Sequence, residues 1–425
     1  MNRYMTDRQK HIKKLQSYVD GTQYDGRKHF LDQSDPSPPI LERAPHVVAP
    51  VVENATSSHV EFLFGEGRAP RLSTKPSDLL DSRHGRLEFE HAARTLLKNA
   101  LETGECFAIA GVTDDSRILI EIIDPAVVKS GSPFVIEHPV EKDGKTFLRR
   151  RVVDEKSDTT FFEVEAPIDP RAKIEWRANP DLTVEHNFGF VPVVHWNRGC
   201  AIHEKYFDEI DALNRTLSQR NRAALYAGDP QMFEVGVSPS EAEQSAIGRF
   251  ASADKAERFY TYRTDERARV KGVSTVWSSA NENAEFGMLT LPGDALRAID
   301  DECQRLRELL HEAFSYVDLD LSKTTVIADL SGKALELLYR RQIAFCSVLR
   351  SEVERYILTP LLLMIHDVCG CELSEPIVWE WGRWFDPTPG DAINSAKSAI
   401  AAVGAGILSV EEARAYVSYY FGVRK

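Results

Sequence analysis

The feature that most constrains this chain is a long helical pattern at about residues 333–368 with a proline inside it. A straight helix of that length would measure on the order of 54 Å, at about 1.5 Å per residue. Pro360 removes a main-chain hydrogen bond, so it should kink the helix. A long helix with one apolar stripe also needs a neighbour to cover that stripe. The pattern therefore favours a multi-element scaffold or an assembly of subunits.

Length and composition limit the class of protein. A chain of 425 residues is expected to form two to four domains, and its 43% apolar and 28% charged residues are typical of a soluble, folded protein. No apolar run is long enough to cross a membrane, and the N-terminus lacks the apolar core of a signal peptide, so we expect a protein made in the cytoplasm. The net charge of −13 argues against a simple nucleic-acid binder, but it permits a channel through which DNA slides without sticking.

The first half of the chain reads as an α+β unit, about residues 50–196. Helical spacing predicts helices over Thr6–Tyr18, Val51–Phe64 and Leu87–Leu101. Short apolar or alternating runs then predict an antiparallel sheet. The runs are Cys106–Ala110, Ile118–Ile123, Val135–Glu137, Phe147–Val153, Thr160–Val164, Lys173–Trp176 and Val191–Trp196.

The second half reads as two long helices around a mixed insert, followed by a helical tail. The helices are predicted over 204–227 and 294–316, with the insert at 229–280. Within the insert we expect strands at Gln231–Val235, Phe259–Tyr262 and Val270–Val276 and a helix at Pro239–Phe250. Towards the C-terminus we expect a strand at Pro376–Trp381 and helices at Asp391–Val403 and Ser409–Tyr420, the last with a Ser409/Glu412 capping box.

No recognisable catalytic constellation is present, so we predict a non-enzymatic protein without a cofactor. Ser331-Gly332-Lys333-Ala334 is not a phosphate loop, because Ile327 stands where its first glycine would be and Ala334 replaces the magnesium-binding Ser or Thr. The acidic triplet Asp300-Asp301-Glu302 reads as a solvated helix face, since consecutive helical side chains diverge.

A metal site remains an open alternative at the end of the long helix. His366, Cys369 and Cys371 form a weak ligand pattern, which a metal-dependent hydrolase could use. The favoured reading is a helix that ends at Gly370, with small half-buried thiols around it, and no metal.

Four segments in order together resemble the portal proteins of tailed bacteriophages, the head–tail connector family of long-tailed phages and prophages. Asn187–Val194 is similar to the strand that ends the family's wing domain, and Phe207–Ser218, with Asp211-Ala212-Leu213-Asn214, is similar to the helix that follows it. Asp329–Leu335, with its Ser-Gly-x-Ala-Leu, is similar to the start of the family's long kinked helix. Val51–Gly67 resembles an early helix that ends in a glycine turn.

The resemblance implies a domain map. It assigns residues 1–196 to an N-terminal arm and α+β wing, 197–228 and 281–316 to two stem helices, and 229–280 to a clip. It further assigns 317–331 to a tunnel loop, 332–390 to the long kinked wing helix and strand, and 391–425 to a short helical crown or tail.

The resemblance also implies a function. Such proteins form rings, typically of twelve subunits, at the capsid vertex of the virion, and they assemble in the host cytoplasm. They conduct double-stranded DNA during packaging and ejection and contact the terminase large subunit, head-completion or adaptor proteins, and the capsid and scaffold proteins. The alternative function is that of another virion or assembly component, such as a head–tail adaptor protein.

Candidate DNA-facing residues follow from that map. The tunnel-loop candidates are Asp318, Asp320, Ser322, Lys323, Thr324 and Thr325. One lysine against two aspartates should let the loop contact phosphates without gripping them. The stem candidates are Arg215, Arg220 and Arg222, which could instead pair with acidic residues of a neighbouring subunit.

Overall fold

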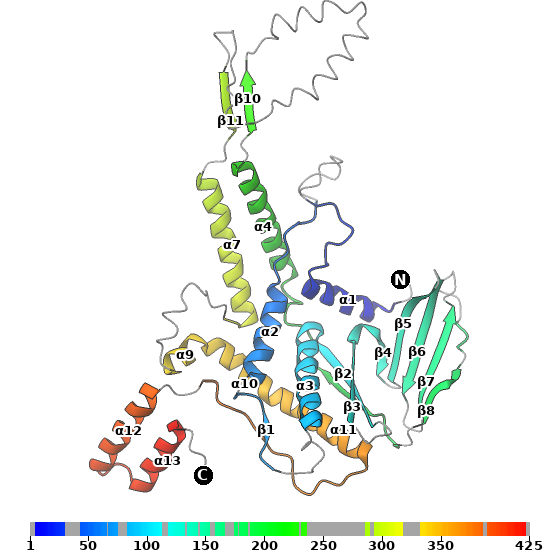
Figure 1. Ribbon diagram of the computed structural model, residues 1–425. Helices are drawn as coiled ribbons and strands as arrows, with labels where there is room; N and C mark the ends of the chain where they lie inside the picture. The colour runs from blue at the N-terminus through cyan, green and yellow to red at the C-terminus, as the bar shows by residue number, and fades with distance from the viewer. Residues whose placement is uncertain are drawn as a thin grey trace, which may run out of the picture. The chain divides into compact units, whose positions relative to one another are not determined.

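The computed structural model divides into two compact units, and each is described by itself. The first unit contains Met1–Asn214 and Arg305–Lys425, and the second contains Arg215–Gln304. The structure describes residues 5–29, 43–65, 67–74, 83–112, 118–131, 134–142, 145–153, 158–165, 174–176, 178–185, 188–228, 231–235, 285–289, 293–317, 332–385 and 389–421. The predicted α+β class is confirmed (Figure 1).

Three helices open the first unit, and all three were predicted. They are α1 (Asp7–Asp20), α2 (Val51–Phe64) and α3 (Arg83–Thr103). Thr6 and Gln9 form a reciprocal capping box at the start of α1, which satisfies main-chain N–H groups that have no partner within the helix. The turn that ends α3 needs a glycine, because Gly104 has a φ of +82° and a Cβ there would lie 3.0 Å from the Cys200 main chain.

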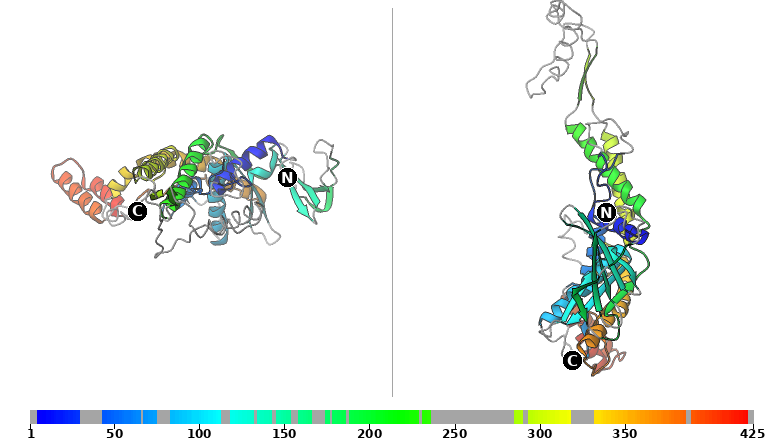
Figure 2. Two further views of the ribbon diagram at one scale, coloured as in Figure 1. Left: turned by 90° about the horizontal axis from the view of Figure 1, so that it is seen from above. Right: turned by 90° about the vertical axis from the view of Figure 1, so that its right-hand side faces the viewer.

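Two antiparallel sheets follow (Figures 1 and 2). The smaller has the order β3-β2-β9, with β2 at Glu105–Val112, β3 at Ile118–Ile123 and β9 at Val193–Asn197. The larger has the order β4-β5-β6-β7-β8. Its strands are Val128–Gly131, Phe134–Lys142, Lys145–Val153, Asp158–Glu165 and Ala178–Glu185. A 3-10 turn, Pro125–Val127, precedes β4.

One predicted strand of the larger sheet is wrong. The described residues of Lys173–Trp176, 174–176, have no strand structure, and the fifth strand is β8 instead. Trp176 has a different role: the Arg150 guanidinium stacks on its ring at 4.0 Å from the centroid. The prediction failed because Trp176, an apolar residue of the predicted strand, packs against the Arg150 guanidinium instead. The short strand β4 was not predicted.

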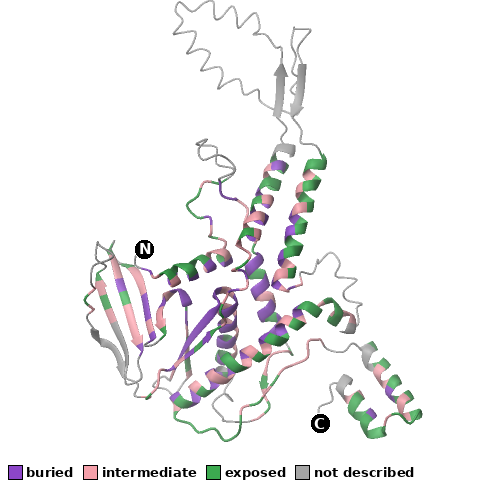
Figure 3. Cartoon of the chain, turned by 180° about the vertical axis from the view of Figure 1, so that it is seen from behind, coloured by how far each residue is buried: buried purple, intermediate pink, exposed green. Residues whose placement is uncertain are grey.

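The main core of the first unit brings distant segments together, as the purple residues of Figure 3 show. It joins residues of α2, α3, β2 and β9 to helical residues of the segment 346–368, with Leu63, Leu97, Val353 and Leu361 all fully buried. A second cluster lies between the two sheets and joins Phe107 and Ile109 of β2 to Phe134 and Ile136 of β5.

The predicted single long helix is instead several consecutive segments. They are α9 (Gly332–Leu338), α10 (Arg340–Val353), a π-helical turn (Glu354–Leu358) and α11 (Thr359–Cys369). In an unbroken α-helix the Pro360 ring would clash with the carbonyl four residues earlier. The wider π turn lies just before the proline, and the Thr359 N–H donates to the Glu354 carbonyl five residues back. The helix ends at Gly370 with a φ of +63°, as predicted.

The segment after α11, residues 376–385, crosses back over this π turn. Its only strand is β12 (Trp379–Glu380), which pairs with β1 (Arg71–Leu72), so the predicted strand Pro376–Trp381 is too long. The indole N–H of Trp379 donates to the Thr359 hydroxyl at 3.1 Å, and that of Trp381 donates to the Glu354 carboxylate at 3.4 Å. The alternating apolar residues of this segment suggest a longer strand. Instead, two of its tryptophans form hydrogen bonds to the π turn.

The second unit consists of parts of two long helices and the ribbon between them. The helices are α4 (Phe207–Gly228) and α7 (Gly293–Phe314), and the ribbon is the antiparallel pair β10 (Gln231–Val235) and β11 (Glu285–Leu289). The predicted stem segment 281–316 is therefore wrong at its start, where a strand stands before the helix. The segment 197–228 becomes helical only at Phe207. The predictions Pro239–Phe250, Phe259–Tyr262 and Val270–Val276 lie outside the described residues.

A two-helix hairpin, α12 (Pro389–Gly404) and α13 (Val410–Phe421), is the last described part of the chain. The predicted capping box is confirmed: the Glu412 N–H donates to the Ser409 hydroxyl at 3.2 Å, and the Ser409 N–H donates to the Glu412 carboxylate at 2.8 Å. None of the helices that the structure describes could cross a bilayer.

Candidate functional site

The first turns of α4 are held by a cluster of polar side chains around Asp211. The Tyr18 hydroxyl donates to one carboxylate oxygen at 3.0 Å, and the Tyr24 hydroxyl donates to the other at 2.5 Å. Asn214 is fully buried; its Oδ1 accepts the Ala49 N–H at 2.8 Å, and its Nδ2 donates to the Tyr24 hydroxyl at 3.3 Å. We call these four side chains the Asp211 cluster.

Burial and the neighbouring carboxylate keep both phenols of this cluster protonated. Burial raises the pKa of Tyr18 and Tyr24 above the ordinary value for tyrosine, and Asp211 raises it further. Both hydroxyls therefore remain donors to the carboxylate at neutral pH. The Asp-Ala-Leu-Asn segment that carried the family resemblance thus has a definite role here: it fixes α4 to α1 and to the chain before α2.

A second cluster holds the end of α7, and it is buried and uncharged. The His59 Nε2 lies 2.8 Å from the Phe314 carbonyl oxygen, and its Nδ1 lies 3.5 Å from the Cys346 sulfur. Burial lowers the pKa of His59 to about 4, so the ring is neutral at pH 7. We assign its single N–H to Nε2, which donates to Phe314, and Nδ1 then accepts the Cys346 thiol.

Gln342 extends this cluster to the residues that follow α7. Its Oε1 accepts the Val317 N–H at 3.2 Å, and its Nε2 donates to the Ser58 hydroxyl at 3.0 Å. Gln342 is 1% exposed. We call Ser58, His59, Gln342 and Cys346 the His59 cluster. It joins α2, α10 and the chain that leaves α7.

Sequence reasoning missed the polar role of these residues. Helical spacing puts His59 on the apolar face of the predicted helix Val51–Phe64, and Gln342 belongs to no motif described above. A histidine on an apolar stripe and a glutamine at a core position of α10 are the signals that could have found the cluster, because buried polar groups need partners. Their partners are not readable from spacing, since His59 and Phe314 are 255 residues apart.

The predicted stem residues lie on α4, with different surroundings. Arg215 and Arg220 are exposed, and Arg222 is half-buried. Arg220 forms an ion pair with Asp300 of α7, and both side chains are about half exposed, at 51% and 50%. Asp300 of the predicted solvated acidic face is thus at the surface but carries a partner. The predicted tunnel-loop residues Asp318, Asp320, Ser322, Lys323, Thr324 and Thr325 lie outside the described residues.

The residues of the alternative metal site do not share one environment. His366 is 1% exposed, whereas Cys369 is half-buried and Cys371 is exposed. Within the described ranges, no group of three or more His, Cys, Asp or Glu side chains is arranged to hold a metal ion.

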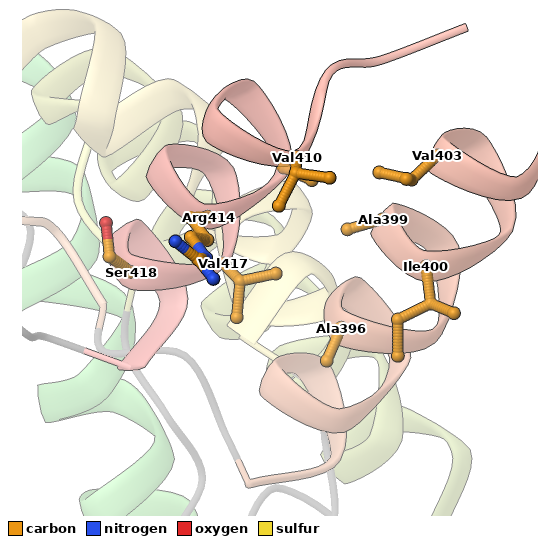
Figure 4. A pocket seen from close by; sticks show the side chains of 9 residues that line it. Ala396, Ala399, Ile400, Val403, Val410, Arg414, Val417 and Ser418 are labelled. Carbon is orange, nitrogen blue, oxygen red and sulfur yellow. The ribbon is translucent and has the colours of Figure 1, made fainter. Parts of the chain in front are cut away.

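An apolar groove runs between α12 and α13. In Figure 4 side chains from the two helices point toward one another across it. Its lining consists of Ala396, Ala399, Ile400, Val403, Val410, Ala413, Arg414, Val417 and Ser418. Ile400 and Val410 are 72% and 53% exposed, so the hairpin leaves much of its apolar surface uncovered.

These elements define an α+β fold in which two polar clusters attach the long helices α4 and α7. No family model and no curated protein matches the chain. Among solved structures, it is similar to a chain in the neck of a native gene transfer agent particle, computed with C12 symmetry, at 12% identity and a TM-score of 0.43, over 87% of this chain and 89% of that one.

Two further structures are similar to the same degree. A chain in the neck of an empty gene transfer agent particle, computed with C6 symmetry, has 12% identity and a TM-score of 0.45 over 87% and 90% of the two chains. A chain in the virion of a native gene transfer agent particle has 11% identity and a TM-score of 0.41 over 87% and 90%. Because identity is this low, function has to be inferred from this chain's own residues and contacts.

Proposed function

We propose that this chain is the ring-forming portal subunit of a tailed phage or prophage, which conducts double-stranded DNA and catalyses no reaction. The observation that carries the proposal is the attachment of both long helices to one α+β scaffold. The Asp211 cluster fixes the start of α4 and the His59 cluster fixes the end of α7. The chain between these two attachments contains the ribbon β10–β11 and the segment assigned to the clip.

The polar chemistry supports a structural role. The buried polar side chains of both clusters are directed at main-chain groups and at one another, such as Asn214 at the Ala49 N–H and His59 at the Phe314 carbonyl. Such contacts satisfy helix ends and loop amides. They leave little capacity for binding a substrate, which is the arrangement expected of a scaffold.

Exposed apolar side chains support assembly into a ring. Leu337 and Val348, on α9 and α10, are 68% and 59% exposed, and Ile400 and Ile407 of the hairpin region are 72% and 75% exposed. A head-to-tail interface that closes by rotation would bury such surfaces against an identical neighbour. We place the subunit number at twelve, as is typical of the family that the sequence resembles.

DNA contact is assigned to the six tunnel-loop residues 318, 320 and 322–325, and to the stem residues Arg215, Arg220 and Arg222. Arg220 also forms an ion pair with Asp300 of α7 in the same chain. The proposed partners are the terminase large subunit, a head-completion or adaptor protein, and the capsid and scaffold proteins. The proposed location is the portal vertex of the virion, reached after assembly in the host cytoplasm.

Imaging tests the assembly. Negative-stain microscopy of the purified full chain should show rings with an axial hole. A monodisperse monomer at high protein concentration would overturn the proposal.

Deletion of residues 319–325 tests the role in packaging. Rings should still form, while the amount of DNA packaged in the phage that encodes the chain should fall to background. Normal packaging by such rings would favour a head–tail adaptor instead, since an adaptor acts after the DNA is inside.

A further inference from the structure

The last residues of α7 are held by several specific contacts, although the chain leaves the helix there for residues 318–331. Ser315 has a φ of +55°, which is uncommon for a residue with a side chain, and it stops the helix. The Tyr316 N–H returns to the His311 carbonyl at 3.2 Å. The Phe314 carbonyl, which has lost its helical partner, accepts from His59 instead.

The same cluster also holds the chain that follows residues 318–331. Gln342 and Cys346 are one turn apart on α10, which comes directly after the short helix α9. Gln342 accepts from Val317, the last described residue before those residues, and Cys346 contacts His59. The two sides of the chain are thus tied to each other and to α2 through Ser58 and His59.

We propose that the His59 cluster is a positioning device: it sets where the chain leaves α7 and where it returns on α10, and so where residues 318–331 are presented. The inference rests on the proposed function, which assigns those residues to DNA contact. Ser58, His59, Gln342 and Cys346 are positioning residues in this sense, because none of them has to touch DNA itself.

The composition of the cluster suits this task. Its hydrogen bonds join neutral groups, and His59, Gln342 and Cys346 are buried, so their strength does not depend on the salt that accompanies DNA. The ion pair between Glu312 and Arg341 links the same two helices at 2.7 Å, but each side chain is 66% exposed. Salt screens such a pair, and it cannot define a geometry in the same way.

The test compares Gln342→Met and His59→Phe with an unrelated variant of equal thermal stability. Gln342→Met keeps the size of the side chain and removes both hydrogen bonds. His59→Phe keeps the ring against Phe345, whose centroid lies 4.6 Å away, and also removes both bonds. Ile136→Ala is the control, because Ile136 belongs to the second core cluster, which strands β2 to β6 form.

Amide hydrogen exchange of the full-length ring reads the positioning directly. We expect the Val317 amide to exchange at least about tenfold faster in Gln342→Met than in the wild type and in Ile136→Ala. Rings should form in all three, while DNA packaging should fall in the cluster variants and persist in the control. His59→Gln, which can both donate and accept, should restore part of the packaging lost in His59→Phe.

Two results would overturn the inference. One is an unchanged Val317 exchange rate in Gln342→Met. The other is an equal loss of packaging in Ile136→Ala, which would make the effect one of general stability. A wild-type chain that forms no rings would instead refute the proposed function, and the exchange comparison would still decide whether the cluster fixes the chain.

Discussion

The Asp211 cluster and the His59 cluster each attach one long helix to the first unit, but one is built around a carboxylate and the other from neutral groups. The Asp211 cluster is built around a half-buried carboxylate, with two phenols and the buried amide of Asn214. The His59 cluster joins neutral groups, of which His59, Gln342 and Cys346 are buried and Ser58 is half-buried. Water can reach the Asp211 carboxylate but not the His59 ring, so loss of a partner should cost more at His59. The attachment of α7 therefore depends on a His59 ring that stays neutral.

The largest effect is expected for His59→Ala. The substitution leaves a cavity and removes the partners of the Phe314 carbonyl and the Cys346 thiol, so the free energy of unfolding should fall by roughly 3–5 kcal/mol. Denaturant unfolding followed by tryptophan fluorescence measures it. Ile136→Val serves as a control and should cost only about 1 kcal/mol. A loss at His59 no larger than that would mean that the site is hydrated.

The second-largest expected effect is the pH dependence of the free energy of unfolding. Unfolded His59 takes up a proton below its ordinary pKa of 6.5, whereas the folded ring does so only near its lowered pKa of about 4. The folded state therefore loses stability as the pH falls from about 6.5 to 4, by up to about 3 kcal/mol.

Comparison of the wild type with His59→Gln isolates this contribution. Burial also lowers the pKa of His203 to about 4, but that residue is present in both proteins and cancels. The slope of unfolding free energy against pH should be smaller in His59→Gln by nearly one proton. Equal slopes would show that His59 is protonated in the folded chain.

A smaller effect is expected for Asn214→Ala in the Asp211 cluster. The change leaves the Ala49 N–H without its acceptor, so the free energy of unfolding should fall by about 1–3 kcal/mol. Gln219→Ala, an exposed change on the same helix, is the control and should be within about 0.5 kcal/mol of the wild type. A cost at Asn214 above that at His59 would reverse the order of the two clusters.

The smallest effect is expected for Arg341→Ala. The Glu312–Arg341 pair is largely exposed, so its coupling energy should be below about 1 kcal/mol and should shrink further at high salt. A double-mutant cycle with Glu312→Ala measures that coupling directly. A coupling of several kcal/mol would mean that the surface pair, and not the buried cluster, joins α7 to α10.

Much of the local structure followed from the sequence. The bounds of α2, β3 and β10 match their predictions, and α11 ends at Gly370 as expected. These features depend on residues within a few positions of one another. Errors arose where a tertiary partner decided the outcome, as for Trp176 under Arg150 and for the tryptophans that bind the π turn.

The sequence by itself determined the periodic helices, most of the strands, the capping boxes and the glycine ends, because each depends on local backbone preference. Only the tertiary structure decided how the chain accommodates Pro360, which partners Asp211 and Asn214 have, and that His59 and Gln342 hold the end of α7. Hydrogen bonds across 255 residues, as between His59 and Phe314, exist only when packing excludes water and aligns the groups, and no local pattern encodes that alignment.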